Sequence, residues 1–207
     1  MFLISPEAGC FRQGEILSHV IQLHVDPASL EDPEGQSFEE RTHPFAVILT
    51  QDCDLDWDFQ TRTAEMTADT RKRKHLPNIL LCELFEVDTL KPQYNSNLWQ
   101  RISRNQDERF HYLAACHGQD DRKGAGLPVL VVDFKRVFSI PTEELYKRVT
   151  SGLERRTTLS IPFSQDLANR FGCYMLRVAL PGQDRLLIGP AALRLDAQPM
   201  APQPDPE

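Results

Sequence analysis

The pattern of apolar and polar positions predicts several short β-strands joined by polar connections. Residues 44–50 are apolar at every position from Phe45 to Leu49, which is typical of a strand covered on both faces. The other segments alternate only in part, as half-buried strands do. The predicted strands are residues 14–23, 44–50, 79–87, 109–114 and 127–140.

Three segments have the spacing or the capping residues of helices. Residues 162–178 carry apolar side chains three and four apart, which form one stripe on a helix. Residues 142–149 begin with Thr142, a predicted N-cap, followed by two acids that suit the helix dipole. A further helix is predicted to begin at Asn95 or Ser96. The polar segments 26–42, 56–75 and 117–126 are predicted to be loops or turns.

Strands in excess of helices predict a mainly β chain of the α+β class, folded as a small curved β-barrel or half-barrel with helical additions. We expect one domain over residues 1–196, with a barrel core at 12–146 and a helical C-terminal part at 142–196. Residues 197–207 are rich in proline and are predicted to be a disordered tail.

Charge and composition narrow the expected environment. The chain has 207 residues and a net charge of −7, which disfavours general binding to a nucleic-acid backbone. No apolar run approaches the ~18 residues that span a bilayer, so no membrane partner is expected. Its five cysteines form no C-x-x-C pair, and the first residues do not resemble a secretory signal. These features predict reduced thiols and a cytoplasmic protein.

Three segments together resemble the PemK/MazF-like family, whose members are SH3-like barrels of bacterial toxin–antitoxin systems. Residues 13–16 read QGEI, like the family's opening strand, and residues 43–49 read HPFAVIL, like its arginine–proline strand. Residues 131–140, followed by 142–145, resemble the late strand that runs into a short helix. The resemblance covers residues 12–146 and implies a barrel that binds RNA or an antitoxin protein.

The same segments depart from the family at its ribonuclease site. An arginine before the proline helps to bind and cleave RNA in the family, whereas this chain has His43 there and Arg41 two residues earlier. A small hydroxyl residue usually completes the site on the next strand, where this chain offers Cys82. The resemblance therefore implies an altered or absent site. An endoribonuclease with a rearranged site would use Arg41, His43, Asp54 and His111.

Gln51, Asp52, Cys53 and Asp54 follow directly after the apolar strand, where a rigid strand end presents side chains to a ligand. Cys53 as a nucleophile would need His111 or His43 as its base, but the flanking carboxylates disfavour a thiolate. The preferred interpretation is a small buried cysteine whose neighbouring acids cap a turn. A binding role for these four residues together with His111 remains open.

Cys53, Cys82, His111 and Cys116, with His117, include the ligand types that zinc prefers. No pair has the short spacing of a zinc motif, so zinc is a weak alternative and no cofactor is predicted. Residues 109–112, RFHY, are read as a strand with Phe110 and Tyr112 on one face, in preference to a base-stacking surface. Arg155 and Arg156, with Lys135 and Arg136, are a candidate basic patch.

The sequence carries no Walker loop and no G-x-S-x-G, H-E-x-x-H or G-x-G-x-x-G motif. The leading hypothesis is therefore a PemK-like barrel without strong evidence of catalysis. It would be a component that binds another protein, or RNA, in a toxin–antitoxin or phage-defence system. That setting follows from the resemblance alone.

Overall fold

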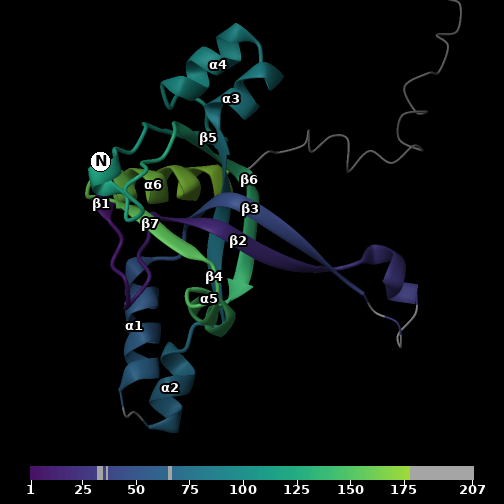
Figure 1. Ribbon diagram of the computed structural model, residues 1–207, viewed down its shortest axis with the longest axis vertical. Coiled ribbons are helices and arrows are strands. Elements are labelled where there is room, and N and C mark those ends of the chain that lie inside the picture. Colours follow the sequence, from purple (N-terminus) through teal and green to yellow (C-terminus); the bar gives the residue numbers. More distant parts are fainter. Residues whose placement is uncertain (32–34, 36, 65–66, 178–207) are drawn as a thin grey trace, which may run out of the picture. The chain divides into compact units, whose positions relative to one another are not determined.

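The computed structural model describes residues 1–31, 35, 37–64 and 67–177, and its centre is a seven-stranded antiparallel sheet (Figure 1). The strand order is β1-β7-β2-β3-β4-β6-β5. The predicted α+β class with a mainly β core is confirmed, but the sheet is open, with β1 and β5 at its edges. The strands are β1 Phe2–Ile4, β2 Glu15–Val25, β3 Phe38–Ile48, β4 Asn78–Glu86, β5 Phe110–Leu113, β6 Leu130–Pro141 and β7 Glu154–Leu159.

Helices lie over both faces of the sheet and beyond one of its ends (Figure 1). The α-helices are α1 Asp52–Thr63, α2 Ala68–Lys74, α3 Val87–Leu90, α4 Ser96–Ser103, α5 Thr142–Arg148 and α6 Phe163–Met175. Short 3₁₀ helices are η1 Pro27–Glu31, η2 Lys91–Gln93 and η3 Gly118–Asp120. These elements belong to one compact unit, Met1–Met175. The predicted tail at 197–207 and the boundary at 196 lie outside the described residues.

The two faces of the sheet carry separate hydrophobic cores. On one face, Val47 and Cys82 pack with Leu167 of α6. On the other face, Ile48 and Leu81 pack with residues of α1 and α5. Because neighbouring residues of a strand point to opposite faces, the continuous apolar run of β3 supplies both cores. This explains why the run at residues 45–49 could be recognised as a buried strand.

All five predicted strands are present, but β1 and β7 were not predicted. β3 is also longer than expected, since it begins at Phe38, inside the segment 26–42 that was predicted to be a loop. β7 reads ERRTTL, which has no apolar run, although most of its side chains are buried. Its polar side chains are buried because ion pairs and hydrogen bonds satisfy them, a contribution that hydrophobic periodicity does not detect.

The prediction of a polar loop over residues 56–75 is wrong, because most of this segment lies in α1 and α2. The buried positions of α1 are Leu55, Asp58 and Thr61, so its buried side is mostly polar. The Asp58 carboxylate accepts hydrogen bonds from Arg62 Nε (2.6 Å) and from the backbone N–H of Leu76 (2.8 Å). A paired carboxylate thus takes a core position that an apolar residue would normally mark.

The other helices follow their predictions with small differences. Asn95 caps α4, its Oδ1 accepting from the Leu98 N–H at 2.9 Å. Thr142 is not the N-cap of α5 as predicted: Pro141 takes that place, and the Thr142 N–H donates to the Pro77 carbonyl (3.0 Å). In the predicted helix 162–178, Leu167 is fully buried, whereas the last predicted position lies outside the described residues.

β2 changes the phase of its alternation at His19. This residue has a left-handed backbone conformation, with φ of 58°, although it is not a glycine. Leu17 and Val20, three residues apart, consequently lie in the same core cluster, whereas regular alternation would place them on opposite faces. Pairing with β3 continues on both sides of His19, through Ser18 with Phe45 and Val20 with His43.

Candidate functional site

The segment Gln51 to Asp54 follows the strand end as predicted, but it starts a helix and does not close a turn. Gln51 is the N-cap residue of α1, and its side chain makes no capping hydrogen bond. Asp52 is the first helical residue, where its charge suits the helix dipole. Its Oδ1 accepts from the Gln13 N–H at 2.8 Å and lies 3.3 Å from Arg12 Nε. Asp52 therefore fastens the loop before β2 to the start of α1.

The expectation of a buried Cys53 is wrong, because its side chain is exposed. Its sulfur lies 3.6 Å from Gln51 Oε1 and 3.9 Å from Asp54 Oδ1. Neither neighbour is a histidine or a cation, the groups that activate a cysteine nucleophile. The geometry gives Cys53 no chemical partner for attack.

His111 does not join this segment. It lies on the edge strand β5, paired with Val132, on the face that α6 covers. Its Nδ1 is 4.0 Å from the Asp166 carboxylate, and neither ring nitrogen has a hydrogen-bond partner among the described residues. Burial, with the charge of Arg170 as a smaller cause, lowers the pKa of His111 to about 4. Leu55 of α1 packs in the opposite core, so His111 and the segment 51–54 belong to opposite faces.

The interpretation of residues 109–112 as a strand is confirmed by β5. β5 includes Phe110 and Tyr112, and both side chains pack in the small core beneath α3 and α4. Arg109 forms a two-point ion pair with Asp133, its Nε and Nη2 lying 2.7 and 2.6 Å from the carboxylate oxygens. The cation and the aromatic rings are thus used within the fold.

Arg41 and His43 do come together, through an acid that sequence reasoning missed. Arg41 Nη2 is 3.2 Å from Glu83 Oε2, and His43 Nδ1 is 3.4 Å from Glu83 Oε1, outside hydrogen-bond geometry. His43 Nε2 lies 3.1 Å from the Gln22 amide oxygen, and its ring stacks on Phe138 at 4.1 Å between centroids. Burial lowers the pKa of His43, and Glu83 opposes that shift.

This cluster contains half of the predicted ribonuclease set. Asp54 lies on α1 and His111 on β5, which β4 and β6 separate from the strand of His43. The clue to Glu83 was its place in the apolar run ILLCELF of β4. An acid buried within such a run indicates a paired charge, because an unpaired carboxylate is costly to bury.

The predicted zinc ligands are not gathered into one site. Cys82 and Cys116 share a core, whereas Cys53 is exposed on α1. The Cys82 thiol donates to the Asp133 carbonyl (3.1 Å), and burial raises the pKa of both core thiols, whereas zinc requires thiolates. Within the described parts of the chain, no group of three or more His, Cys, Asp or Glu residues could hold a metal ion.

β7 buries one arginine on each of its faces, so Arg155 and Arg156 do not form the basic patch considered from the sequence. Arg155 is fixed by Glu15, with Nε to Oε1 at 2.6 Å, and by the carbonyls of the loop before β2. Arg156 forms a two-point pair with Asp121, both distances being 2.8 Å. This pairing raises the pKa of Arg156 and, against the effect of burial, lowers that of Asp121.

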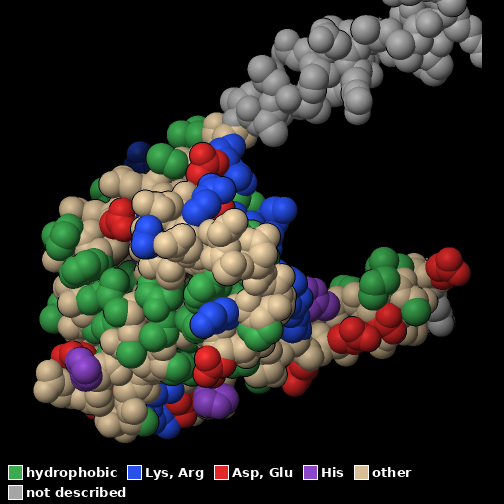
Figure 2. Space-filling view, turned by 90° about the horizontal axis from the view of Figure 1, so that it is seen from above, with side chains coloured by type: hydrophobic (Ala, Val, Ile, Leu, Met, Phe, Trp, Pro, Cys, Tyr) green, Lys and Arg blue, Asp and Glu red, His purple; other side chains and the backbone are tan. Residues whose placement is uncertain are grey.

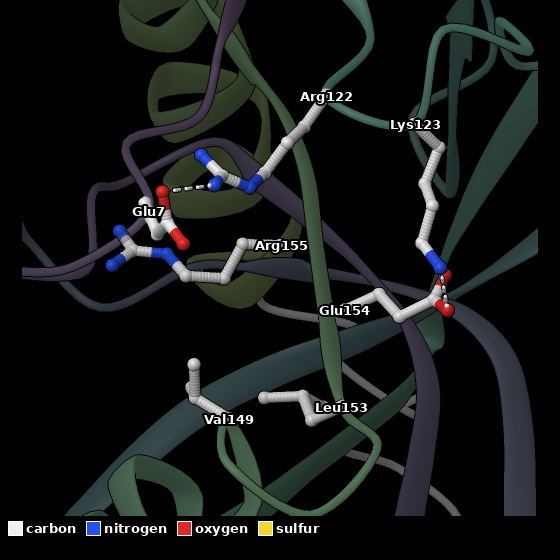
Figure 3. Close-up of a pocket in the computed structure, with 7 residues that line it drawn as sticks. All are labelled: Glu7, Arg122, Lys123, Val149, Leu153, Glu154 and Arg155. Carbon is white, nitrogen blue, oxygen red and sulfur yellow. Dashed lines mark ion pairs between the residues drawn. The ribbon is translucent and has the colours of Figure 1, made fainter.

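A pocket of about 270 Å³ opens beside Arg155 (Figure 3). It lies between the N-terminal loop, the turn around residue 122 and the connection from α5 to β7. Arg122 Nη2 is 2.9 Å from the Glu7 carboxylate, and Lys123 pairs with Glu154 on the opposite wall. The lining residues are Glu7, Arg122, Lys123, Val149, Leu153, Glu154 and Arg155.

The outer parts of β2 and β3 form a two-stranded arm, residues 21–25 paired with residues 38–42. The arm extends away from the body of the sheet, and η1 lies at its tip (Figure 1). β4 pairs with β3 only from Phe45 to Ile48, and β7 pairs with β2 only from Glu15 to Ser18. No third strand therefore extends the sheet along the arm within the described residues.

One face of the arm carries apolar side chains that are open to solvent, next to Glu40, which pairs with Leu23. Leu23 is 48% exposed and Phe38 is 63% exposed, and Val25, which pairs with Phe38, lies on the same face. Figure 2 shows hydrophobic and acidic side chains together on this projection. Its exposed acids are Glu31, Glu39 and Glu40. An apolar face beside acids was not predicted, because the segment 26–42 reads as a polar loop.

Comparisons with known proteins do not assign this chain to a family. No family model, no curated protein and no solved structure matches it. Among the described residues, no helix has the length and apolar character needed to cross a membrane. The arm and the clusters described above are therefore the features from which a function can be inferred.

Proposed function

We propose that this protein is a binding component that docks a partner protein through the apolar face of the β2–β3 arm. The observation that carries the proposal is the exposure of Leu23, Val25 and Phe38 on a projecting two-stranded ribbon. An isolated hairpin is marginally stable in water, and contiguous exposed apolar side chains mark interaction surfaces. A partner that covers this face would stabilise the arm and remove its apolar surface from water.

The charge of the arm defines the chemistry of the partner. Glu31, Glu39 and Glu40 are exposed, whereas Arg41 is paired with Glu83. A matching surface would be an apolar cleft with lysine or arginine at its rim, since complementary charge guides association. RNA is the less favoured partner, because its phosphates would be repelled by these acids.

The PemK-like SH3 fold and the toxin–antitoxin or phage-defence setting are part of the same proposal. Their support is that two of the matching segments lie on neighbouring elements: residues 13–16 lead into β2, and residues 43–49 include the end of β3. The third lies on β6 and enters α5. The antitoxin-type partner implied by the resemblance would be a protein, which agrees with the chemistry of the arm.

The test places a photo-crosslinking amino acid at position 23 or at position 24 of the full chain in living cells. These adjacent positions are exposed on opposite faces of the arm. We expect one protein to crosslink from position 23 and not from position 24. That protein, once purified, should bind Leu23→Asp at least about tenfold more weakly than wild type, a loss of ~1.4 kcal/mol. His24→Asp should bind like wild type.

Two outcomes would overturn this proposal. Equal crosslinking from both positions, or none, would show that the apolar face is not the contact. Crosslinks to RNA or to a second copy of the chain would replace the proposed partner with a different one. The two variants are matched, because each adds one negative charge at an exposed position. Thermal unfolding of both checks that each is folded.

An endoribonuclease is the second candidate, because Arg41, His43 and Glu83 are clustered. Histidine can accept a proton near neutral pH, and arginine can stabilise a developing phosphorane charge. His43 is only 1% exposed, so RNA could reach it only after local opening of the strands. Cleavage of RNA by the purified chain, lost in His43→Ala and retained in His111→Ala, would support this function. Absence of cleavage across metals and pH values would reject it.

A further inference from the structure

We propose that the pocket of Figure 3 binds a small organic anion, whose carboxylate or phosphate monoester group replaces the Glu7 carboxylate beside Arg122. This site is separate from the arm and does not depend on the proposed function. Its ligand would combine one anionic group with a compact apolar body. Two fixed guanidinium groups, one exchangeable carboxylate and an apolar floor support this site.

Both guanidinium groups are held in place by the backbone. Arg155 is 3% exposed and donates to the carbonyls of Gly9 and Cys10 as well as to Glu15. Arg122 Nη1 donates to the Ser5 carbonyl at 3.3 Å. Arginine remains charged at all relevant pH values, and its planar fork matches carboxylate and phosphate oxygens. The pocket therefore has a wall with two guanidinium groups fixed in place, Arg155 paired with the buried Glu15 and Arg122 paired with the exposed Glu7.

The Glu7 carboxylate marks the anion position and is easily displaced from it. In the view of Figure 3 it lies between Arg122 and Arg155, and Arg122 is its ion-pair partner. The Glu7 side chain is 86% exposed and sits on a loop outside any helix or strand. An exposed ion pair changes an equilibrium by about fivefold at most, so a ligand anion can replace Glu7 at little cost.

The remaining lining limits the size and charge of the ligand. Val149 and Leu153 supply an apolar floor, as Figure 3 shows. A volume of about 270 Å³ is close to the lower end of the ~300–1,000 Å³ typical of ligand pockets, which suits a small molecule. Glu154, paired with Lys123 on the far wall, would repel an extended polyanion. A single anionic group on an apolar body satisfies all of these features.

The experiment measures binding of benzoate and of phenyl phosphate to the full chain by calorimetry at low salt, with benzyl alcohol as the uncharged comparison. We expect saturable binding of at least one anion and none of the alcohol. Glu7→Gln should bind that anion up to about fivefold more tightly, because the competing carboxylate is gone. Arg122→Ala should lose binding, and Arg122→Lys should weaken it. The anion that binds identifies the carboxylate or the phosphate as the recognised group.

Matched variants separate this site from general charge effects. Glu143→Gln removes another exposed, ion-paired carboxylate, and Arg101→Ala removes another exposed, ion-paired arginine. Both should bind the anion like wild type. Equal affinities for Glu7→Gln and Glu143→Gln, unchanged binding in Arg122→Ala, or no saturable binding of either anion to wild type and Glu7→Gln would each overturn the proposal.

Discussion

β7 and the β2–β3 arm belong to one sheet, yet they reverse the usual relation between polarity and burial. β7 buries Arg155 and Arg156, whereas the arm exposes Leu23 and Phe38. The arginines are tolerated inside because Glu15 and Asp121 lie beside them with two-point hydrogen bonds. The apolar residues remain outside because nothing in the described chain covers the arm's outer strand pair. Polarity alone therefore does not assign a side chain of this sheet to the core or to the surface; its partners do.

The largest expected effect breaks the buried side of this comparison. Glu15→Ala leaves the Arg155 guanidinium buried and without its carboxylate, so we expect the free energy of unfolding to fall by about 3–5 kcal/mol. Urea denaturation followed by circular dichroism measures the change. Glu143→Ala, which breaks an exposed pair with Lys147, should leave the free energy of unfolding nearly unchanged, because solvent screens the pair. Similar losses in the two variants would contradict the role given to burial.

A second expected effect concerns His111, a buried side chain whose ring nitrogens have no hydrogen-bond partner among the described residues. The pKa of His111 falls from 6.5 to about 4 on folding, so between these values the unfolded state binds the extra proton. Its contribution to stability is therefore complete above pH 6.5 and is lost as the pH falls towards 4, by about 3 kcal/mol in total. Urea midpoints measured from pH 7 to pH 4 should fall more steeply in wild type than in His111→Phe. Parallel pH profiles would show that His111 keeps its ordinary pKa.

The smallest expected effect is that of Leu23→Ala, on the exposed side of the comparison. Leu17 and Leu23 lie on the same strand, one fully buried and the other 48% exposed. Leu17→Ala should lower the free energy of unfolding by about 2–5 kcal/mol, because it leaves a cavity in the core. Leu23→Ala should change it by less than about 0.5 kcal/mol. A large loss in Leu23→Ala, measured by denaturant unfolding of the free protein, would mean that the arm is already covered.

The sequence predicted those elements whose apolar residues are buried in the ordinary way. The run at residues 45–49 identified β3, and Asn95 identified the start of α4. β7 and α1 were missed because their buried positions include charged residues; the partners of the two β7 arginines lie far away in the sequence. Asp58 is paired locally with Arg62, but its other contact is the N–H of Leu76, after α2. Such pairings depend on tertiary structure and leave no periodic pattern.

The candidate sites show the same limit. Arg41 and His43 are neighbours on one face of β3, so their proximity could be predicted from a two-residue spacing. Glu83 joins them through the register of β3 with β4, which sets Glu83 opposite Ala46. Residues 51–54 were placed correctly after the strand, but the helix that follows has too few apolar positions to be recognised. His111 was grouped with them because residue type, not position in the sheet, was the only information.

The left-handed conformation of His19 changes which positions of β2, odd or even, face a given side of the sheet. Before this residue Leu17, at an odd position, faces the core that contains Ile48 and Leu81. After it, Val20, at an even position, faces the same core. The outward-facing set Ile21, Leu23 and Val25 is therefore independent of the inward-facing set that the body requires. Substitutions in the outer half of β2 can therefore change the exposed face of the arm without changing the composition of the core. A single backbone angle thus lets the two halves of β2 carry their apolar residues at different positions of the alternation.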